Sequence, residues 1–373
     1  MFIGVPRERK EQEYRVALVP SAVKELVLRG HTVLVEEGAG EGIGASDAVF
    51  AHAGASIAAD ADTLYAKADL IVKVKEPQAD ERAFLRPGQM LFAYLHLAAD
   101  PAQARDLLKS DAICIAFETV TSPSGRLPLL TPMSEIAGRL AVQAGAYWLQ
   151  RANGGSGVLL SGAPGVAPAK VMILGGGVVG ANAIAIAVGM GADVVVLDRV
   201  PDVLRALSKE FGSRIKTEFS TSDSIRMHIA DADLVIGGVL VTGAAAPKLI
   251  TMADLGSMRP GSVFVDVSID QGGCAETSRP TTHSQPTFVE NGVVHYCVAN
   301  MPGAVPRTSA AALSNAILPY VLVLADYGWR RALLRDAHLM NGLNVCKGQI
   351  THSAVAEALR MPSYDPRACL EAA

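Results

Sequence analysis

The chain has 373 residues, of which 50% are hydrophobic and 19% are charged, and its formal net charge is −4. This length favours two domains, and a weak negative charge without a basic run argues against binding to nucleic acid or to an anionic membrane. No secretory signal is evident, and the longest dense apolar run near the C-terminus, residues 317–325, is about half of a bilayer span. Five scattered cysteines without a CxxC pair predict buried free thiols in a reducing cytoplasm rather than disulfides or a zinc site.

The first third of the chain alternates short apolar strands with amphipathic helices. We expect strands at residues 2–6, 31–38, 69–75, 89–97 and 112–120. We expect helices at residues 21–30, 61–67 and 101–110. Strands that alternate with helices of about ten residues predict parallel βαβ units, and therefore a doubly wound sheet.

The same alternation restarts after residue 170. A helix is predicted at residues 131–153, followed by a Gly/Pro-rich linker at 154–169. Further strands are predicted at 170–175, 193–198, 232–240, 262–270 and 293–300. A long helix over 307–334 is expected to kink at Pro319, and the last dozen residues are expected to fray.

A glycine motif follows the first strand of the second sheet. Gly175, Gly177 and Gly180 match G-x-G-x-x-G between an apolar strand and an alanine-rich helix, and Asp198 ends the next strand. In a dinucleotide-binding loop these glycines permit a tight turn, a close approach of the pyrophosphate and close packing of helix on strand. A carboxylate at Asp198 suits an adenosine ribose and favours NAD over NADP, although Arg199 could accommodate a 2′-phosphate. A glycine-rich turn without a ligand is the weaker interpretation.

Together these patterns predict an α/β protein with two doubly wound, Rossmann-like parallel sheets and an active-site cleft between them. Ligands of such sheets bind beyond the carboxyl ends of the strands. Polar residues at those predicted ends are therefore candidates for the site: Arg15, Lys75 and His96 in the first sheet, and Asp270 and Asn300 in the second.

As a group these residues suit a small carboxylate substrate. Arg15 can bind a carboxylate with two hydrogen bonds, Lys75 adds a point charge, and a histidine such as His96 can exchange protons near neutral pH. Each also has a structural alternative: Arg15 as a solvated loop charge, His96 as a core histidine and Asp270 as a turn cap. The histidines lack metal-ligand spacing, so no metal site is predicted.

Two lysines interrupt the apolar strand ADLIVKVKEP at residues 68–77. A strand period of two places Lys73 and Lys75 on the same face, so alternation does not distinguish them. Lys75 lies at the carboxyl end, just before Pro77, and is the predicted substrate ligand. Lys73 is expected to form a structural ion pair. The alternatives are that it pairs with an acid at the surface or extends its ammonium to solvent.

These residues stand in segments that resemble NAD-dependent alanine dehydrogenases, which are related to the NAD-binding part of nicotinamide nucleotide transhydrogenases. The matching segments are IGVPRERKEQEYRVALVP, DLIVKVKEP, LFAYLHLAAD, LPLLTPMSEIAGRLAVQAGA, LGGGVVGANA, VDVSIDQGG and VANMPGAVPRTS. They cover nearly the whole chain, to about residue 335, and the tail beyond departs from the pattern.

The resemblance implies roles for individual residues. Arg15 and Lys75 would hold the substrate carboxylate, His96 would act as the general acid and base, and Asp270 would assist at the reacting carbon. Besides the three glycines of the loop, the implied cofactor contacts are Ser134, Val178, Val179, Asp198, Ser220, Val239, Leu240, Val267, Arg279, Val298, Asn300 and Met301.

The resemblance also implies an architecture and a reaction. A discontinuous substrate domain would comprise residues 1–130 and 306–373, an NAD-binding domain residues 131–305, and six identical subunits would assemble in the cytoplasm. The implied reaction is reversible oxidation of L-alanine by NAD to pyruvate and ammonium. The alternatives are an NAD(H)-binding subunit of a transhydrogenase, a dehydrogenase for another small amino acid or 2-oxo acid, and a catalytically silent NAD-sensing protein.

Overall fold

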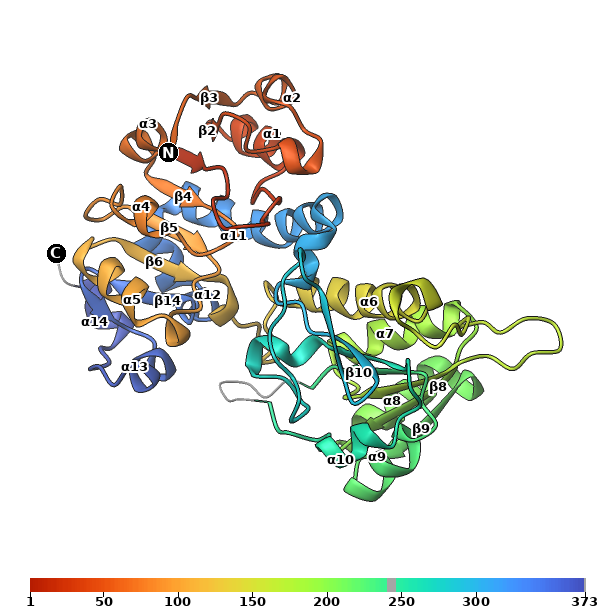
Figure 1. Ribbon diagram of the computed structural model, residues 1–373. Helices are drawn as coiled ribbons and strands as arrows, with labels where there is room; N and C mark the ends of the chain where they lie inside the picture. Colours follow the sequence, from red (N-terminus) through yellow and green to blue (C-terminus); the bar gives the residue numbers. More distant parts are fainter. Residues whose placement is uncertain (240–245, 372–373) are drawn as a thin grey trace. The chain divides into compact units, whose positions relative to one another are not determined.

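The computed structural model describes residues 1–239 and 246–371. The chain divides into two compact units: unit 1 comprises Met1–Met133 and Val305–Ala373, and unit 2 comprises Ser134–Ala304. The domain boundaries expected from the sequence, after residues 130 and 305, lie close to this division. In Figure 1 the red-to-orange and dark blue segments belong to unit 1.

Unit 1 is built on an eight-stranded sheet in the order β15-β14-β6-β5-β4-β1-β2-β3. The strands β1 to β6 pair in parallel, whereas β14 and β15 are antiparallel at one edge. The bounds are β1 Phe2–Val5, β2 Thr32–Glu36, β3 Ser56–Ala58, β4 Leu70–Val72, β5 Met90–Ala93, β6 Ile113–Ala116, β14 Leu343–Cys346 and β15 Gln349–Ile350.

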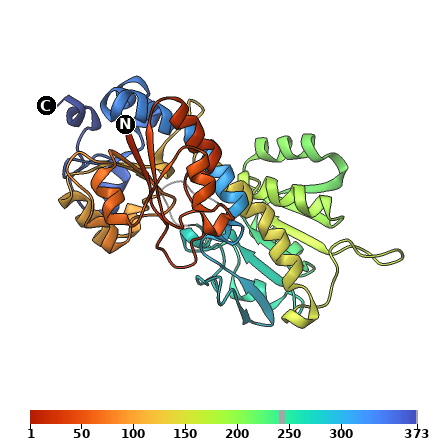
Figure 2. The ribbon, with the colours of Figure 1, turned by 90° about the horizontal axis from the view of Figure 1, so that it is seen from above.

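Helices cover both faces of this sheet (Figures 1 and 2). Their starts follow ordinary capping chemistry: Pro20 opens α1, and the side chains of Asp60 and Asp100 accept hydrogen bonds from the first turns of α3 and α5. The bounds are α1 Pro20–Leu28, η1 Glu41–Ile43, α2 Asp47–His52, α3 Ala61–Lys67, α4 Ala79–Arg82, η2 Leu97–Ala99, α5 Pro101–Lys109, η3 Phe117–Thr119, α11 Pro306–Arg335, α12 Ala337–Met340, α13 Ser353–Leu359 and α14 Pro366–Glu371.

Unit 2 contains a seven-stranded sheet in the order β12-β13-β11-β10-β7-β8-β9, parallel except for β12. Along β7, Val171 and Ile173 belong to one apolar cluster and Met172 and Leu174 to another, so the sheet is buried on both faces. The strand bounds are β7 Lys170–Leu174, β8 Asp193–Asp198, β9 Ile215–Phe219, β10 Leu234–Gly237, β11 Val263–Asp266, β12 Thr287–Glu290 and β13 Val293–Tyr296.

The helices of unit 2 complete its βαβ units. Their bounds are α6 Thr131–Trp148, η4 Arg151–Asn153, α7 Val178–Gly189, α8 Pro201–Phe211, η5 Gly212–Arg214, α9 Ser222–Ile229, α10 Met252–Gly256, η6 Val267–Gln271 and η7 Met301–Ala304. Both sheets are therefore mostly parallel with helices on both sides, which confirms the predicted α/β class.

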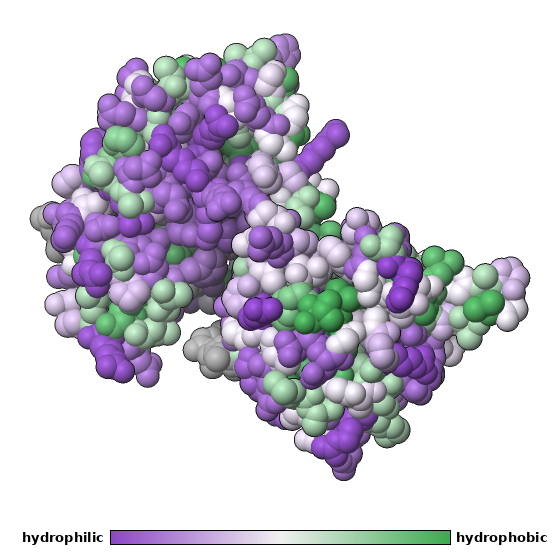
Figure 3. Space-filling model, viewed as in Figure 1, coloured by the Kyte–Doolittle hydropathy of each residue, from purple (hydrophilic) through white to green (hydrophobic). Residues whose placement is uncertain are grey.

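The long helix α11 is apolar enough to cross a membrane by length and composition alone. Its most apolar window is 44% buried, and the fully buried side chains of Leu313, Ile317 and Leu324 show that it is packed in unit 1 as a core helix. The backbone leaves helical angles at Gly328, with φ of 69°, and not at Pro319 as the sequence suggested. In the view of Figure 3, the surface over unit 1 is mostly hydrophilic.

The structure corrects the sequence analysis in three further places. The strands expected at 69–75 and 89–97 are regular only over β4 and β5. Within the last dozen residues, which were expected to fray, Pro366–Glu371 form the helix α14. Cys346 of β14 and Cys369 of α14 form a disulfide across 23 residues, whereas Cys114, Cys274 and Cys297 are the buried free thiols expected. The spacing of the cysteines in the sequence does not predict the Cys346–Cys369 disulfide, because the disulfide forms only where α14 lies beside β14 in the fold.

Candidate active site

The strand order of unit 1 reverses at β1, which has β2 on one side and β4 on the other. The loops that follow β1 and β4 therefore leave the sheet side by side, and such a reversal is where ligands bind in open parallel sheets. The loop after β1 contributes Glu8 and Arg15, and the segment after β4 contributes Lys73 and Lys75. The fold thus brings together, at one sheet edge, residues that are about 60 positions apart in the chain.

Arg15 is buried, with 2% of its surface exposed, so it is not a solvated loop charge. Its Nε and Nη2 each donate a hydrogen bond of 2.6 Å to the carboxylate of Glu13, and Nη1 lies 3.0 Å from the Met133 sulfur. Burial alone would lower the pKa of Arg15, but the ion pair with Glu13 outweighs it and raises the pKa above its ordinary value. The guanidinium is therefore held charged and oriented. Glu13 stands two positions before Arg15, in one of the segments that resemble alanine dehydrogenases, but its residue type and spacing alone predict no role.

The two lysines after β4 have different surroundings. Lys75 is half-buried at the carboxyl end of the sheet, whereas Lys73 is buried and forms ion pairs with Glu8 and Glu81. Lys73 therefore neither reaches a surface acid nor extends to solvent. Its backbone still follows the sheet, because its N–H donates to the Phe92 carbonyl at 3.2 Å beyond the regular end of β4.

His96 follows β5 in a left-handed backbone conformation, with φ of 49° and ψ of 37°. Its ring stacks on Tyr94, with centroids 5.9 Å apart, and its side chain is 48% exposed, so it is not a core histidine. The Glu118 carboxylate accepts the His96 backbone N–H at 2.6 Å and lies 3.9 Å from His96 Nδ1. Left-handed angles are unfavourable for a residue with a side chain, and Glu118 supplies a bond that stabilises them.

Sequence reasoning missed Glu118, although a usable signal was present. Glu118 follows β6, and so lies at the same carboxyl edge where Arg15, Lys75 and His96 were sought. The apolar pattern predicts a strand over residues 112–120, which places Glu118 inside it, whereas β6 ends at Ala116 and Glu118 lies in η3.

In unit 2 the strand order reverses between β7 and β10, and the glycine loop leaves the sheet at that point. Gly175 has φ of 90°, which only glycine adopts readily. A Cβ on Gly180 would overlap the carbonyl oxygen of Gly175, so this glycine is needed for the close contact of α7 with the loop. Both observations match the turn and packing roles expected of the motif.

Gly177 differs from its two partners. It is exposed, its φ is −68°, and a Cβ built on it would meet no protein atom within 4 Å. Nothing in unit 2 thus requires glycine there, whereas a phosphate at the N-terminus of α7 would. The loop therefore fits a dinucleotide pyrophosphate.

Asp198 at the end of β8 lies against this loop. Its Oδ2 accepts the Gly176 N–H at 2.6 Å, and its Oδ1 accepts the Val200 N–H at 2.7 Å. The carboxylate is thereby fixed where a dinucleotide-binding sheet presents an acid to the adenosine ribose.

Asp270 lies in η6, directly after β11, and its side chain is exposed. The buried Asp266 supports this turn: its Oδ1 accepts the Ser268 N–H at 3.0 Å, and its Oδ2 accepts the Cys274 N–H at 2.8 Å. Burial raises the pKa of Asp266, while these hydrogen bonds oppose that shift. Ser268 also joins η6 to the neighbouring loop, since its hydroxyl donates to the Val239 carbonyl at 2.8 Å. The alternative role of Asp270, that of capping a turn, is instead performed by Asp266.

Seven of the other predicted cofactor residues are at least partly exposed. Five lie at or near the carboxyl edge and are at least partly exposed: Val178 and Val179 in the first turn of α7, Val239 after β10, Val267 in η6 and Asn300 after β13. Ser134 is partly exposed in α6, and Arg279 is exposed with its guanidinium 4.2 Å from the Phe288 ring centroid. Asn300 has a left-handed φ of 65°.

Three predicted cofactor residues are buried, namely Ser220, Val298 and Met301. Val298 and Met301 belong to an apolar cluster of unit 2, so their side chains contribute to its core. Leu240 lies outside the described residues. Within residues 1–239 and 246–371, no group of three or more His, Cys, Asp or Glu side chains is arranged to hold a metal ion.

Comparison with known proteins identifies the family. Residues 4–137 match the N-terminal domain, and residues 141–353 the C-terminal domain, of the family described as alanine dehydrogenase/PNT. The chain belongs to the alanine dehydrogenase/PNT family. An alanine dehydrogenase of Halomonas elongata is 60% identical over 96% of each chain.

Comparison with solved structures distinguishes between the two kinds of protein in this family. A structure titled L-alanine dehydrogenase is 50% identical, with a TM-score of 0.94, and the match covers 96% of this chain and 99% of that one. A transhydrogenase structure from Sinorhizobium meliloti is 26% identical, with a TM-score of 0.81, over 95% and 100% of the two chains. The similarity to alanine dehydrogenases is thus much stronger than the similarity to the transhydrogenase.

Proposed function

We propose that the chain is an NAD-dependent L-alanine dehydrogenase that converts L-alanine, NAD and water reversibly to pyruvate, ammonium, NADH and a proton. The observation that carries the proposal is 60% identity to an alanine dehydrogenase over 96% of both chains. The buried Arg15, the half-buried Lys75 and the exposed His96 at one sheet edge add support, because a small carboxylate substrate needs these groups.

In this proposal the residues of unit 1 hold the substrate. Arg15, kept charged by Glu13, and Lys75 bind the carboxylate, and the side chain of His96 takes and returns protons. When bound, NAD supplies the hydride acceptor for the substrate Cα, and the resulting imino acid is hydrolysed to pyruvate and ammonia. Asp270 stabilises positive charge at the reacting carbon or orients the attacking water.

The residues of unit 2 hold the cofactor. The first turn of α7, next to Gly177, binds the pyrophosphate, and Asp198 accepts hydrogen bonds from the adenosine ribose. The remaining proposed contacts are Ser134, Val178, Val179, Ser220, Val239, Leu240, Val267, Arg279, Val298, Asn300 and Met301. Assembly as a homohexamer and a cytoplasmic location belong to the proposal, and light scattering of the purified protein tests the former.

The experiment is NADH formation, followed by absorbance, from NAD with L-alanine, glycine, L-serine or no substrate. We expect turnover with L-alanine, and its loss in Lys75→Ala and His96→Ala variants that still bind NADH. Absence of NADH from every amino acid would overturn the dehydrogenase function. Preference for glycine or L-serine would favour a dehydrogenase for another small amino acid.

A further inference from the structure

A fully buried charged cluster lies beneath the predicted substrate lysine. The ammonium of Lys73 is 3.1 Å from Glu8 Oε2 and 3.2 Å from Glu81 Oε2, and the three side chains are between 0 and 2% exposed. Tyr65 adds a hydroxyl that donates to Glu81 Oε1 at 3.4 Å. No step proposed above uses any of these groups.

Two carboxylates face one ammonium in this cluster, which is a costly arrangement for a protein interior. Burial raises the pKa of Glu8, although the charge of Lys73 opposes the shift. Buried ion pairs of this kind are often no more stabilising than apolar residues of the same volume, because desolvation offsets the attraction. A contribution to the free energy of unfolding is therefore a weak explanation for the cluster. Its hydrogen bonds to the backbone near Lys75 indicate a different role.

Glu8 holds the backbone that carries Lys75. Its Oε1 accepts a hydrogen bond from the Val74 backbone N–H at 2.6 Å, and its Oε2 accepts one from the Lys75 backbone N–H at 3.3 Å. These two bonds lie just beyond Val72, the last residue of β4. They add to the bonds that the Lys73 N–H and the Val74 carbonyl still make with Phe92 and Tyr94. Lys73 in turn keeps the Glu8 carboxylate in place.

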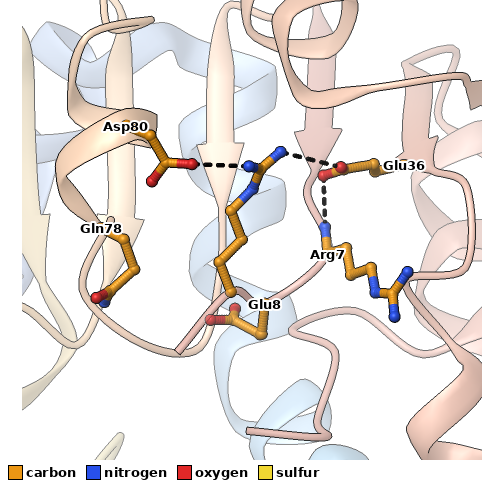
Figure 4. A pocket seen from close by; sticks show the side chains of 6 residues that line it. Arg7, Glu8, Glu36, Gln78 and Asp80 are labelled. Atoms are coloured by element: carbon orange, nitrogen blue, oxygen red, sulfur yellow. Dashed lines mark hydrogen bonds and ion pairs between the residues drawn. The ribbon is translucent and has the colours of Figure 1, made fainter. Parts of the chain in front are cut away.

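The far side of the same segment is held by Glu81, whose Oε2 accepts the Gln78 N–H at 2.7 Å. Between these anchors, Glu76 forms an ion pair with Lys10 at 2.5 Å. Residues 74–78 are thus fastened by three carboxylates from the loop after β1, from α4 and from the segment itself. Glu8 also lines a surface pocket with Glu36, Gln78 and Asp80 (Figure 4). The Arg9 guanidinium, which lines the same pocket, lies 3.6 Å from Glu36 Oε1 and 2.7 Å from Asp80 Oδ2.

We propose that the Glu8–Lys73–Glu81 cluster positions Lys75 for the substrate carboxylate, with Glu8 as the positioning residue that acts on the Lys75 backbone. The inference rests on the proposed function, since it assumes that Lys75 binds the carboxylate. The proposal gives the two lysines different roles: Lys73 holds the Glu8 carboxylate, which fixes the backbone at residues 74 and 75, and Lys75 binds the substrate carboxylate.

The test combines Glu8→Gln with a matched control, Gln89→Leu. Gln89 is also a buried polar residue of unit 1, but it donates to the carbonyls of Tyr65 and Ala68, away from Lys75. For Glu8→Gln we expect the KM for L-alanine and for pyruvate to rise about tenfold, with kcat and the KM for NAD within about twofold. For Gln89→Leu we expect a lower melting temperature and an unchanged KM for L-alanine.

Hydrogen exchange of a peptide spanning residues 73–78 provides a readout that needs no turnover. It should accelerate in Glu8→Gln and not in Gln89→Leu. If Glu8→Gln does not fold, the triple variant Glu8→Gln/Lys73→Met/Glu81→Gln removes all three charges together and serves in its place, with the same expected result. A lower melting temperature with unchanged KM for L-alanine and pyruvate would reduce the cluster to a structural role and overturn the proposal.

The two proposals fail in different ways. Wild-type protein that forms no NADH from L-alanine refutes the proposed function, whereas active wild-type enzyme with an unaltered KM in Glu8→Gln refutes only the positioning role. Unchanged exchange over residues 73–78 in Glu8→Gln would refute the positioning role whether or not the protein is active.

Discussion

Gly177→Ala separates a requirement of the ligand from a requirement of the fold. A Cβ at this position meets no protein atom within 4 Å, and its φ of −68° is accessible to alanine. Replacing glycine at a compatible position stabilises a protein by about 0.4–1 kcal/mol through the unfolded state. The melting temperature of Gly177→Ala should therefore stay the same or rise slightly.

Cofactor binding should respond in the opposite direction. The added methyl group would stand where the pyrophosphate approaches the N-terminus of α7. Loss of one hydrogen bond to a charged phosphate costs about 1.5–3 kcal/mol, which corresponds to roughly a 10- to 150-fold rise in the Kd for NADH. The Kd is measured by NADH fluorescence, and the stability by thermal denaturation of the same samples.

Two neighbouring glycines provide the controls. Gly189→Ala, near the end of α7, also meets no protein atom within 4 Å and should stabilise the helix without changing the Kd. Gly180→Ala should destabilise unit 2, because its Cβ would overlap the Gly175 carbonyl. Gly177→Ala protein that binds NADH as tightly as the wild type would refute the placement of the pyrophosphate.

Three further predictions concern single side chains. Asp198→Ser should raise the KM for NAD and reduce the preference for NAD over NADP, as measured by kcat/KM with each cofactor, whereas an unchanged ratio would contradict the ribose contact. Glu118→Gln should lower kcat about tenfold while NADH binding is retained, since the backbone of His96 loses a charged acceptor; equal kcat values would refute this positioning. Burial lowers the pKa of His295 in the folded state, so its contribution to stability is present above the unfolded-state pKa of about 6.5 and is lost as the pH falls below it. The melting temperature should thus drop between pH 7.5 and 5.5 by less in His295→Asn than in the wild type, and an equal drop in both would contradict the role of His295.

Sequence periodicity predicted most of the elements because it reports local burial. The helix expected at residues 61–67 is α3, and the long helix expected at 307–334 is α11, one residue longer at each end. Strand ends were less accurate: β4 and β5 are shorter than their apolar runs. Apolar residues continue past the last regular ladder bonds, since the chain remains buried after it leaves the sheet, and burial is all that the pattern records.

The sequence by itself determined the glycine loop, the α/β class and the choice of Lys75 over Lys73 as the candidate ligand, because each depends on residues adjacent in the chain. Only the tertiary structure revealed the partners: Glu13 on Arg15, Glu118 on His96, and Glu8 with Glu81 around Lys73. Glu8 comes from the loop after β1 and is 65 positions from Lys73, and Glu118 follows β6 and is 22 positions from His96. Glu13 and Glu81 lie nearer in the chain to the groups they contact, but residue spacing alone does not show that the side chains meet. A buried charge selects its partner by proximity in a low-dielectric interior, and proximity between distant segments is a property of the fold.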